Sequence, residues 1–362
     1  MPLPFPLLPE FGLVRAGLVI GLANVAVAGL ILWRIGPRQP PWRRRLAVSV
    51  ALAAILLGGA AVASGRLVAH FENRIYQDEI IFAETTAHQR MVLTRWREDV
   101  RLYLNGHLQF SSVDEYRYHE ALVHPAMIAA DRRANVLILG GGDGLAARQV
   151  LAYPEVERIE IVDIDARVTG LFRSHRLLTA LNGNALNDPR VRVHNTDAFR
   201  FLQESDALYD VILIDLPDPS APELGKLYST AFYGLAGRRL AAGGMLAAQC
   251  TSPFRARSAY WCIVHTLRAA RWGPQDDQRF VARPYHTLVP TFGTWGFVLA
   301  GRAVPQPATL AVTAPTRYLT TELLPTLFVF PPDMAEVPTP INRLDDPVVS
   351  RLYRAGYHQY LD

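Results

Sequence analysis

Acidic residues follow four segments of the sequence whose apolar composition predicts buried strands. They are Asp143, Asp163, Asp197 and Asp215. The strands alternate with helix-like stretches, which is typical of a parallel sheet, and ligands of such sheets bind beyond the carboxyl ends of the strands. We therefore expect these carboxylates to surround one site, where they would bind a cation or accept a proton from it.

The first of these strands, "NVLILG" (135–140), leads into a glycine-rich loop and then a helix-like stretch. Such loops bind anionic groups at a helix N-terminus. The spacing of Gly140, Gly142 and Gly144 lacks the later glycine of the dinucleotide fingerprint, which disfavours an NAD-dependent oxidoreductase. The alternative is a tight strand-to-helix turn without a ligand.

Two of the strand-end acids are placed to bind an adenosine. Asp163 lies about 20 residues beyond the loop, where an acid can accept hydrogen bonds from both ribose hydroxyls. Asp197 ends the third strand, where a carboxylate can meet the adenine amino group. Together they predict a pocket for an adenosine without a pyrophosphate, namely S-adenosylmethionine or a derivative.

Asp143, inside the glycine loop, selects among such derivatives. The methionine carboxylate of S-adenosylmethionine would lie near it, and two like charges in a partly desolvated site repel by several kcal/mol. A ligand that keeps the amine and lacks the carboxylate fits better, which favours decarboxylated S-adenosylmethionine. The alternative, that Asp143 caps the following helix, does not exclude this role.

The fourth strand ends in "IDLPDPSAP", which contains Asp215 and Asp218. A primary amine has a pKa near ~10 and must lose a proton before it attacks a carbon next to a sulfonium. Asp215 is a candidate base for that proton, and further acids around a narrow cavity would bind the distal ammonium of a diamine. For Asp218 and Pro219 a plain turn is the alternative.

The surrounding pattern predicts an α/β fold: a Rossmann-like, methyltransferase-type parallel sheet with helices on both faces. It is preceded by a small antiparallel β layer, with a hairpin at Asn105 and Gly106, and by two N-terminal transmembrane helices. We expect four parts, which are a transmembrane hairpin (1–70), a β-hairpin subdomain (76–125), a catalytic domain (130–300) and a C-terminal extension (301–362).

The two predicted spans, 16–33 and 46–64, carry no charged side chain, and each is long enough to cross ~30 Å of hydrocarbon. Two such runs argue against a cleaved signal peptide, and a buried helical hairpin is the alternative. The loop between them contains Arg34, Arg38, Arg43, Arg44 and Arg45.

These spans predict a multi-pass protein of the cell membrane. The arginines favour a cytoplasmic loop, which would place the rest of a two-span chain outside the cytoplasm. The chemistry above is cytosolic, which predicts a cytoplasmic catalytic domain, and the basic loop at 34–45 leaves the membrane topology open. The first residues of the sequence, "MPLPFPLLPEFGLV", are also apolar, so the chain could be a short form of a longer multi-span protein.

The composition excludes other classes. The net charge is +4, and no basic stripe interleaved with aromatic residues indicates nucleic-acid binding. The two cysteines, Cys250 and Cys262, cannot form a disulfide framework. No spacing of histidines and acids predicts a metal site.

At these residues the chain resembles the spermidine synthase family, the polyamine aminopropyltransferases, from about residue 84 to 300. The motifs that carry the resemblance are "HQRMVLT", "LYLNGHLQFSSVDEYRYHE", "LGGGDG", "VDIDARV", "NDPRVRVHNTDAF" and "IDLPDPSAPELGKLYSTAFY". The N-terminal spans and the tail motif "NRLDDPVV" are similar to the membrane-attached branch of that family.

The resemblance implies the reaction and a role for each matching residue. Decarboxylated S-adenosylmethionine would be a co-substrate, with no separate cofactor, and putrescine the default acceptor. Contacts to the nucleoside are implied for Gln89, Gly140, Gly142, Asp143, Asp163, Asp197, Ala198 and Pro222. Contacts to the amine are implied for His119, Asp143, Asp215 and Asp218, with Asp215 as the proton acceptor. By analogy the chain forms homodimers.

Departures from the family pattern leave the amine preference open. The sequence reads "DLPDP", "AP" and "PTFGT" where the family commonly has "DSSDP", "GP" and "PTYP". Two rival functions also remain, an S-adenosylmethionine-dependent methyltransferase and a membrane-anchored polyamine-binding protein without turnover. His119 has a structural alternative, a hydrogen-bonded histidine on a helix face.

Overall fold

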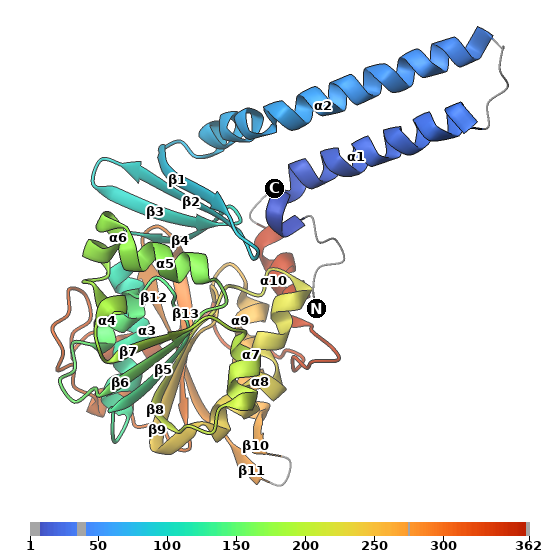
Figure 1. Ribbon diagram of the computed structural model, residues 1–362. Coiled ribbons are helices and arrows are strands. Elements are labelled where there is room, and N and C mark those ends of the chain that lie inside the picture. The colour runs from blue at the N-terminus through green and yellow to red at the C-terminus, as the bar shows by residue number, and fades with distance from the viewer. Residues whose placement is uncertain (1–7, 35–40, 274–275, 360–362) are drawn as a thin grey trace. The chain divides into compact units, whose positions relative to one another are not determined.

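The computed structural model describes residues 8–34, 41–273 and 276–359 (Figure 1). The chain divides into two compact units, Met1–Ser111 and Ser112–Asp362. The second unit contains the residues on which most of the predicted chemistry depends.

The first unit begins with two long helices in contact with each other, α1 (Leu8–Arg34) and α2 (Pro41–Ile75). Each contains an apolar stretch long enough to cross a membrane, Gly17–Arg34 with a mean hydropathy of 1.8 and Arg44–Ser64 with 2.4. Neither stretch is buried inside the structure.

A four-stranded antiparallel sheet completes this unit. Its strands, in spatial and chain order, are β1 (Glu79–Thr85), β2 (Arg90–Trp96), β3 (Asp99–Leu104) and β4 (His107–Ser111). Asn105 and Gly106 connect β3 to β4 with φ angles of 51° and 83°. Positive φ at both positions is what a type I′ hairpin requires, so the predicted hairpin is confirmed.

The second unit is built on a seven-stranded sheet in the order β12-β13-β9-β8-β5-β6-β7. The parallel strands that the sequence predicts are β5 (Asn135–Gly140), β6 (Arg158–Val162), β7 (Val191–His194), β8 (Tyr209–Asp215) and β9 (Leu240–Gln249). Two further strands, which are antiparallel, complete the sheet and make it mixed. β13 (Gly293–Gly301) is antiparallel to β9 and to β12 (Val281–Val289). The pairing with β12 follows from the three-residue turn between the two strands, because a parallel pair needs a longer crossover.

Helices cover both faces of this sheet, as expected (Figure 1). One group is α3 (Glu115–Ala129), α4 (Leu145–Val150), α5 (Ala166–Ser174) and α6 (Arg176–Leu181). The other is α7 (Ala198–Glu204), α8 (Thr230–Arg238), α9 (Arg257–Ala269) and α10 (Val349–His358). The 3-10 helices are η1 (Ala185–Asn187), η2 (Pro222–Tyr228), η3 (Pro307–Thr309) and η4 (Leu324–Phe328), and a two-stranded sheet pairs β10 (Arg271–Gly273) with β11 (Asp276–Arg279).

Helix α3 runs through Pro125 and ends four residues beyond it, at Ala129. A proline lacks the N–H that would bind the carbonyl oxygen four residues earlier. That oxygen, of Ala121, instead accepts a hydrogen bond of 2.8 Å from the Tyr285 hydroxyl on β12. The Tyr285 hydroxyl, far away in the sequence, therefore replaces the backbone hydrogen bond that Pro125 cannot make, and the helix continues.

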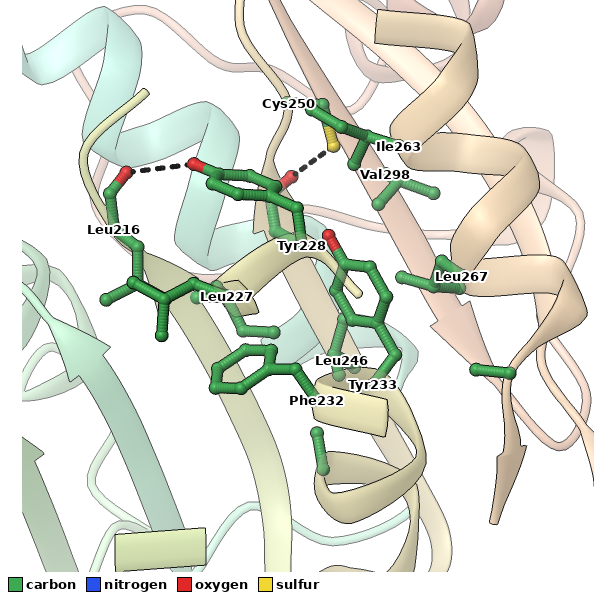
Figure 2. Close-up of a cluster of buried hydrophobic side chains, with 14 of the residues drawn as sticks. Leu216, Leu227, Tyr228, Phe232, Tyr233, Leu246, Cys250, Ile263, Leu267 and Val298 are labelled. Atoms are coloured by element: carbon green, nitrogen blue, oxygen red, sulfur yellow. Dashed lines mark hydrogen bonds between the residues drawn. The ribbon is translucent and has the colours of Figure 1, made fainter. Parts of the chain in front are cut away.

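A buried cluster fixes the chain that follows β8. Figure 2 shows Tyr228, Phe232 and Tyr233 packed among side chains of β9 and α9, all within one hydrophobic core. The Tyr228 hydroxyl donates to the Pro217 carbonyl at 2.8 Å and accepts from Gln249 Nε2 at 2.7 Å. The core thus positions the segment between Asp215 and η2, on which the predicted chemistry depends.

Candidate active site

The glycine loop and the end of β8 are neighbours at the carboxyl edge of the sheet. Gly140, the last residue of β5, pairs in register with Asp215, the last residue of β8. Gly140 has φ +86°, and a Cβ there would lie 1.9 Å from the Asp215 carbonyl oxygen. Only glycine fits this position, so the loop turns directly above Asp215.

Asp163 follows β6 and lies against the same loop. Its Oδ2 accepts from the Gly142 N–H at 3.0 Å, and its Oδ1 accepts from the Asp165 N–H at 2.9 Å. A Cβ on Gly142 would lie 2.4 Å from Oδ2, so this glycine is also required. Burial raises the pKa of Asp163, and the two backbone donors oppose that rise. Each oxygen keeps a lone pair for a further donor such as a ribose hydroxyl.

Asp143 stands at the start of α4. Its Oδ1 accepts from the Leu145 N–H at 2.9 Å, so the structural alternative of a helix-end hydrogen bond is realised. No salt bridge to Asp143 is formed among the residues that the structure describes. Burial, assisted by the charge of Asp215 and opposed by His119, raises the pKa of Asp143 to about 6.

Asp215 receives a hydrogen bond of 2.6 Å from the Tyr118 hydroxyl on α3. Burial raises the pKa of Asp215, while His119 and the Tyr118 hydrogen bond lower it. A carboxylate with a raised pKa is a stronger base, which suits a proton acceptor. Sequence reasoning missed Tyr118, because a tyrosine beside a histidine carries no signal for a partner almost a hundred residues away.

His119 is held by a buried ion pair. Its Nδ1 lies 2.8 Å from Glu115 Oε2, and Arg148 Nη2 donates to Glu115 Oε1 at 2.8 Å. Burial lowers the pKa of His119, but the hydrogen bond and charge of Glu115 outweigh it and raise that pKa overall. The hydrogen-bonded histidine that was the structural alternative is therefore present, and its charge acts on Asp143 and Asp215.

Asp218 lies on the segment that follows β8. Its Oδ2 accepts from Thr251 Oγ1 at 3.1 Å, whereas its buried Oδ1 has no well-aligned partner in the described part of the chain. Burial raises the pKa of Asp218 to about 6. Thr251 has a φ of 63°, a left-handed conformation that a β-branched residue rarely adopts. Sequence reasoning missed Thr251, since nothing in its local pattern predicts this geometry.

Asp197 behaves differently from the other strand-end acids. It caps α7 by accepting from the Arg200 N–H at 3.1 Å, and it forms an ion pair with Lys226 on η2. Burial raises its pKa, but Lys226 and the backbone donors outweigh this and lower it. Ala198 is the first residue of α7 and Pro222 the first of η2, so these residues share the end of the site that Asp197 occupies.

Gln89 belongs to the first unit, where it lies in the turn between β1 and β2. Its carbonyl oxygen accepts hydrogen bonds from the Thr86 N–H at 2.8 Å and from Thr86 Oγ1 at 3.2 Å.

The geometry thus gathers carboxylates at one edge of the sheet and leaves their charge largely uncompensated. The charge of Asp215 acts on both Asp143 and Asp163, and the charge of Asp218 acts on Tyr118. Buried carboxylates with raised pKa values bind cations and accept protons, and such perturbed groups cluster at functional sites.

Comparison with known proteins agrees with this chemistry. The Spermine/spermidine synthase domain matches residues 115–306. The polyamine aminopropyltransferase of Leptospira interrogans is 44% identical over 356 residues, which are 98% of this chain and 69% of that protein. The chain belongs to the spermine/spermidine synthase family. The polyamine aminopropyltransferase of Mycobacterium tuberculosis, another relative, is 38% identical over 361 residues, 98% of this chain and 67% of that one.

Solved structures show that the fold is that of the family. A crystal structure of spermidine synthase in complex with the transition-state analogue AdoDATO is similar with a TM-score of 0.62 at 23% identity, over 70% of this chain and 86% of that one. Spermidine synthase from Thermotoga maritima has a TM-score of 0.60 at 21% identity, over 70% and 85% of the two chains. The resemblance read from the motifs is confirmed.

Proposed function

We propose that this chain moves the aminopropyl group of decarboxylated S-adenosylmethionine onto putrescine, giving spermidine and methylthioadenosine. Its family makes the chain a polyamine aminopropyltransferase, an enzyme of polyamine biosynthesis. The observation that carries the finer proposal is the group of partly buried carboxylates at the strand ends, Asp143, Asp163, Asp215 and Asp218, which have raised pKa values and form no ion pair with a lysine or arginine among the described residues.

In this proposal the nucleoside lies along the carboxyl edge of the sheet. Asp163 accepts hydrogen bonds from the ribose, and Asp197, Ala198 and Pro222 contact the adenine. Asp143 binds the amine of the aminopropyl group and repels the carboxylate that S-adenosylmethionine carries. A negative charge in the glycine loop therefore selects the decarboxylated co-substrate and disfavours methyl transfer.

The acceptor amine is deprotonated before it attacks. Asp215, oriented by Tyr118, takes the proton, while His119 and Asp218 line the amine end. The nitrogen lone pair then attacks the carbon next to the sulfonium, the C–S bond breaks, and the sulfonium becomes a neutral thioether. Positioning and deprotonation are the contributions of the protein.

A product assay tests the reaction and the acceptor together. The purified full chain is incubated with decarboxylated S-adenosylmethionine and, in separate reactions, putrescine, cadaverine, 1,3-diaminopropane or spermidine, and the products are identified by mass spectrometry. The proposal expects spermidine and methylthioadenosine, with the highest kcat/KM for putrescine. A higher kcat/KM for another amine contradicts the choice of acceptor, and methylated products contradict the reaction.

We also propose that α1 and α2 attach the chain to the cell membrane. Their apolar stretches have the length and the exposure that lipid contact requires. The chain should stay with the membrane fraction after alkaline carbonate extraction, and its release would refute attachment. The side of the arginine-rich loop can be found by labelling Trp42→Cys with an impermeant maleimide, since both native cysteines are buried. Homodimers are proposed by analogy and are testable by mass photometry.

A further inference from the structure

The C-terminal part of the chain holds the segment that carries Asp218. Ser350 Oγ donates to the Ala221 carbonyl at 2.9 Å, and Asn342 Nδ2 donates to the Gly225 carbonyl at 2.8 Å. A Cβ on Gly225 would lie 2.9 Å from Pro347 Cβ, so the tail packs directly on η2. The segment after β8 is therefore clamped between the sheet and the C-terminal extension.

Helix α10 begins at this contact, since Ser350 is its second residue. It packs against α9 and η2 (Figure 1). At Gly356 it comes so close to the residue that precedes α9 that an added Cβ would lie 2.7 Å from Ala256 Cα. Val349 and Tyr353 belong to the same hydrophobic core as Tyr228 and Leu216. This packing leaves α10 little freedom to shift.

Two tyrosines of α10 face Asp218. Tyr353 is buried, and its side chain is close enough to hydrogen-bond with the Asp218 carboxyl. The Tyr357 ring contacts the Tyr353 ring in a tilted arrangement, with 4.6 Å between the ring centroids, and the charge of Asp218 acts on Tyr357. The carboxyl otherwise has Thr251 on Oδ2, while Oδ1 is buried without a well-aligned donor.

We propose that α10 forms part of the acceptor end of the active site and that Tyr353 is a positioning residue, whose hydroxyl orients the Asp218 carboxylate toward the acceptor's ammonium. The inference deepens the proposed function and rests on it. Nothing in the tail motif "NRLDDPVV" or in the helix that follows predicts a role at the site, because the contact is formed only by tertiary packing.

Loss of the Tyr353 hydroxyl should change the pKa of Asp218 in one direction, upward. Burial raises the pKa of Asp218 to about 6, and the side-chain hydrogen bonds of Tyr353, Thr251 and Gln249 oppose that rise. Removing the Tyr353 hydroxyl removes a donor that favours the charged form, so the pKa of Asp218 should rise further. The ammonium of the acceptor binds the charged form, and its affinity should therefore fall most at low pH.

The groups that face Asp218 from the elements around it do not reverse this sign. The titratable ones among the described residues are Tyr118 of α3, Tyr228 of η2, Cys250 after β9, and Tyr353 and Tyr357 of α10. Burial raises the pKa of each of them, so they stay neutral near pH 7. Besides these, Asp215 at the end of β8 acts on Tyr118 as Asp218 does, and its negative charge would raise the pKa of Asp218 and so does not reverse the sign.

The test is Tyr353→Phe in the full chain, which keeps the buried ring and removes only the hydroxyl. A rise of about one unit in the pKa of Asp218 would lower kcat/KM for putrescine about fivefold at pH 6 and leave it unchanged near pH 9. The loss should fall on KM and leave kcat at saturating putrescine unchanged. Carbon-13 NMR of aspartate-labelled protein, with the Asp218 signal identified by Asp218→Asn, should show the same rise in pKa without any turnover.

The matched control is Tyr153→Phe. Tyr153 is buried and has a hydrogen bond of 2.8 Å to His124, but it precedes β6 and so lies at the opposite edge of the sheet. The Tyr153→Phe substitution should lower the melting temperature. It should leave unchanged both the pH dependence of kcat/KM for putrescine and the NMR titration of Asp218. A Tyr353→Phe enzyme with the same loss at every pH, or with an unshifted Asp218 signal, overturns the inference. Absence of turnover by the wild type instead contradicts the proposed function, and the NMR titration then decides on Tyr353 by itself.

Discussion

Replacing Asp143 by asparagine should stabilise the folded protein and impair its choice of ligand. The carboxyl has a pKa raised from 3.8 to about 6, mainly by burial. Between these two values the unfolded chain loses its proton first, so the folded state is progressively destabilised as the pH rises from about 4 to 6. Asparagine imitates the protonated form and can still accept from the Leu145 N–H, so it avoids this cost.

The size of the effect follows from the shift. About two pKa units correspond to roughly 3 kcal/mol above pH 6, which the partial exposure of Asp143 reduces to about 1–2 kcal/mol. For a unit of this size the melting temperature should rise by about 3–6 °C at pH 7.5, and by much less at pH 4.5. Thermal unfolding monitored by circular dichroism in detergent across this range measures it.

A control of opposite sign is available at Asp188. The hydrogen bonds of Arg190 lower the pKa of this carboxyl, so Asp188→Asn should reduce stability at pH 7.5. Saturation with decarboxylated S-adenosylmethionine should abolish the difference in melting temperature between Asp143→Asn and the wild type. The reason is that the ammonium of the ligand compensates the charge of the Asp143 carboxylate in the wild type. The reasoning would be refuted if Asp143→Asn raised the melting temperature equally at every pH, or if it lowered the melting temperature at pH 7.5.

Three further substitutions test the site. Asp215→Asn should lower kcat by about 10²–10⁴ while decarboxylated S-adenosylmethionine still binds, as calorimetry would show, and an unchanged kcat would remove Asp215 from the role of base. Tyr118→Phe removes the 2.6 Å hydrogen bond that lowers the pKa of Asp215, so the acid limb of the kcat/KM profile should move to higher pH, with about tenfold lower activity below neutrality. If the acid limb of the profile stayed at the same pH, the result would contradict the role of Tyr118 in lowering the pKa of Asp215. Gly140→Ala places a Cβ 1.9 Å from the Asp215 carbonyl oxygen and should destabilise the protein by about 3 kcal/mol or more, whereas Gly170→Ala, with nothing within 4 Å, should not, as urea unfolding would show.

The strand-end acids could be predicted because the strands before them are continuous apolar runs. A run such as β5 or β8, buried on both faces, is visible without any tertiary information, and its last residue marks the edge where ligands bind. The positions of Asp143, Asp163 and Asp215 at one edge follow from this topology. Their roles toward ligands stay predictions.

What could not be predicted depends on contacts between distant parts of the chain. Lys226 pairs with Asp197 from η2, and Tyr118 reaches Asp215 from α3, and neither pairing leaves a mark in the local pattern. The same holds for α3, which continues through Pro125 because Tyr285 of β12 binds the freed carbonyl oxygen. The antiparallel direction of β13 could not be predicted, because the composition of a strand does not record its direction.

The central claim is that the carboxylates at this edge of the sheet select a nucleoside that has lost its acid group. Isothermal calorimetry of the wild type with decarboxylated S-adenosylmethionine and with S-adenosylmethionine at pH 7.5 tests it most directly. The account predicts that the decarboxylated ligand binds about a hundredfold more tightly, equivalent to roughly 3 kcal/mol, and that Asp143→Asn narrows the ratio. Equal or tighter binding of S-adenosylmethionine by the wild type would contradict it.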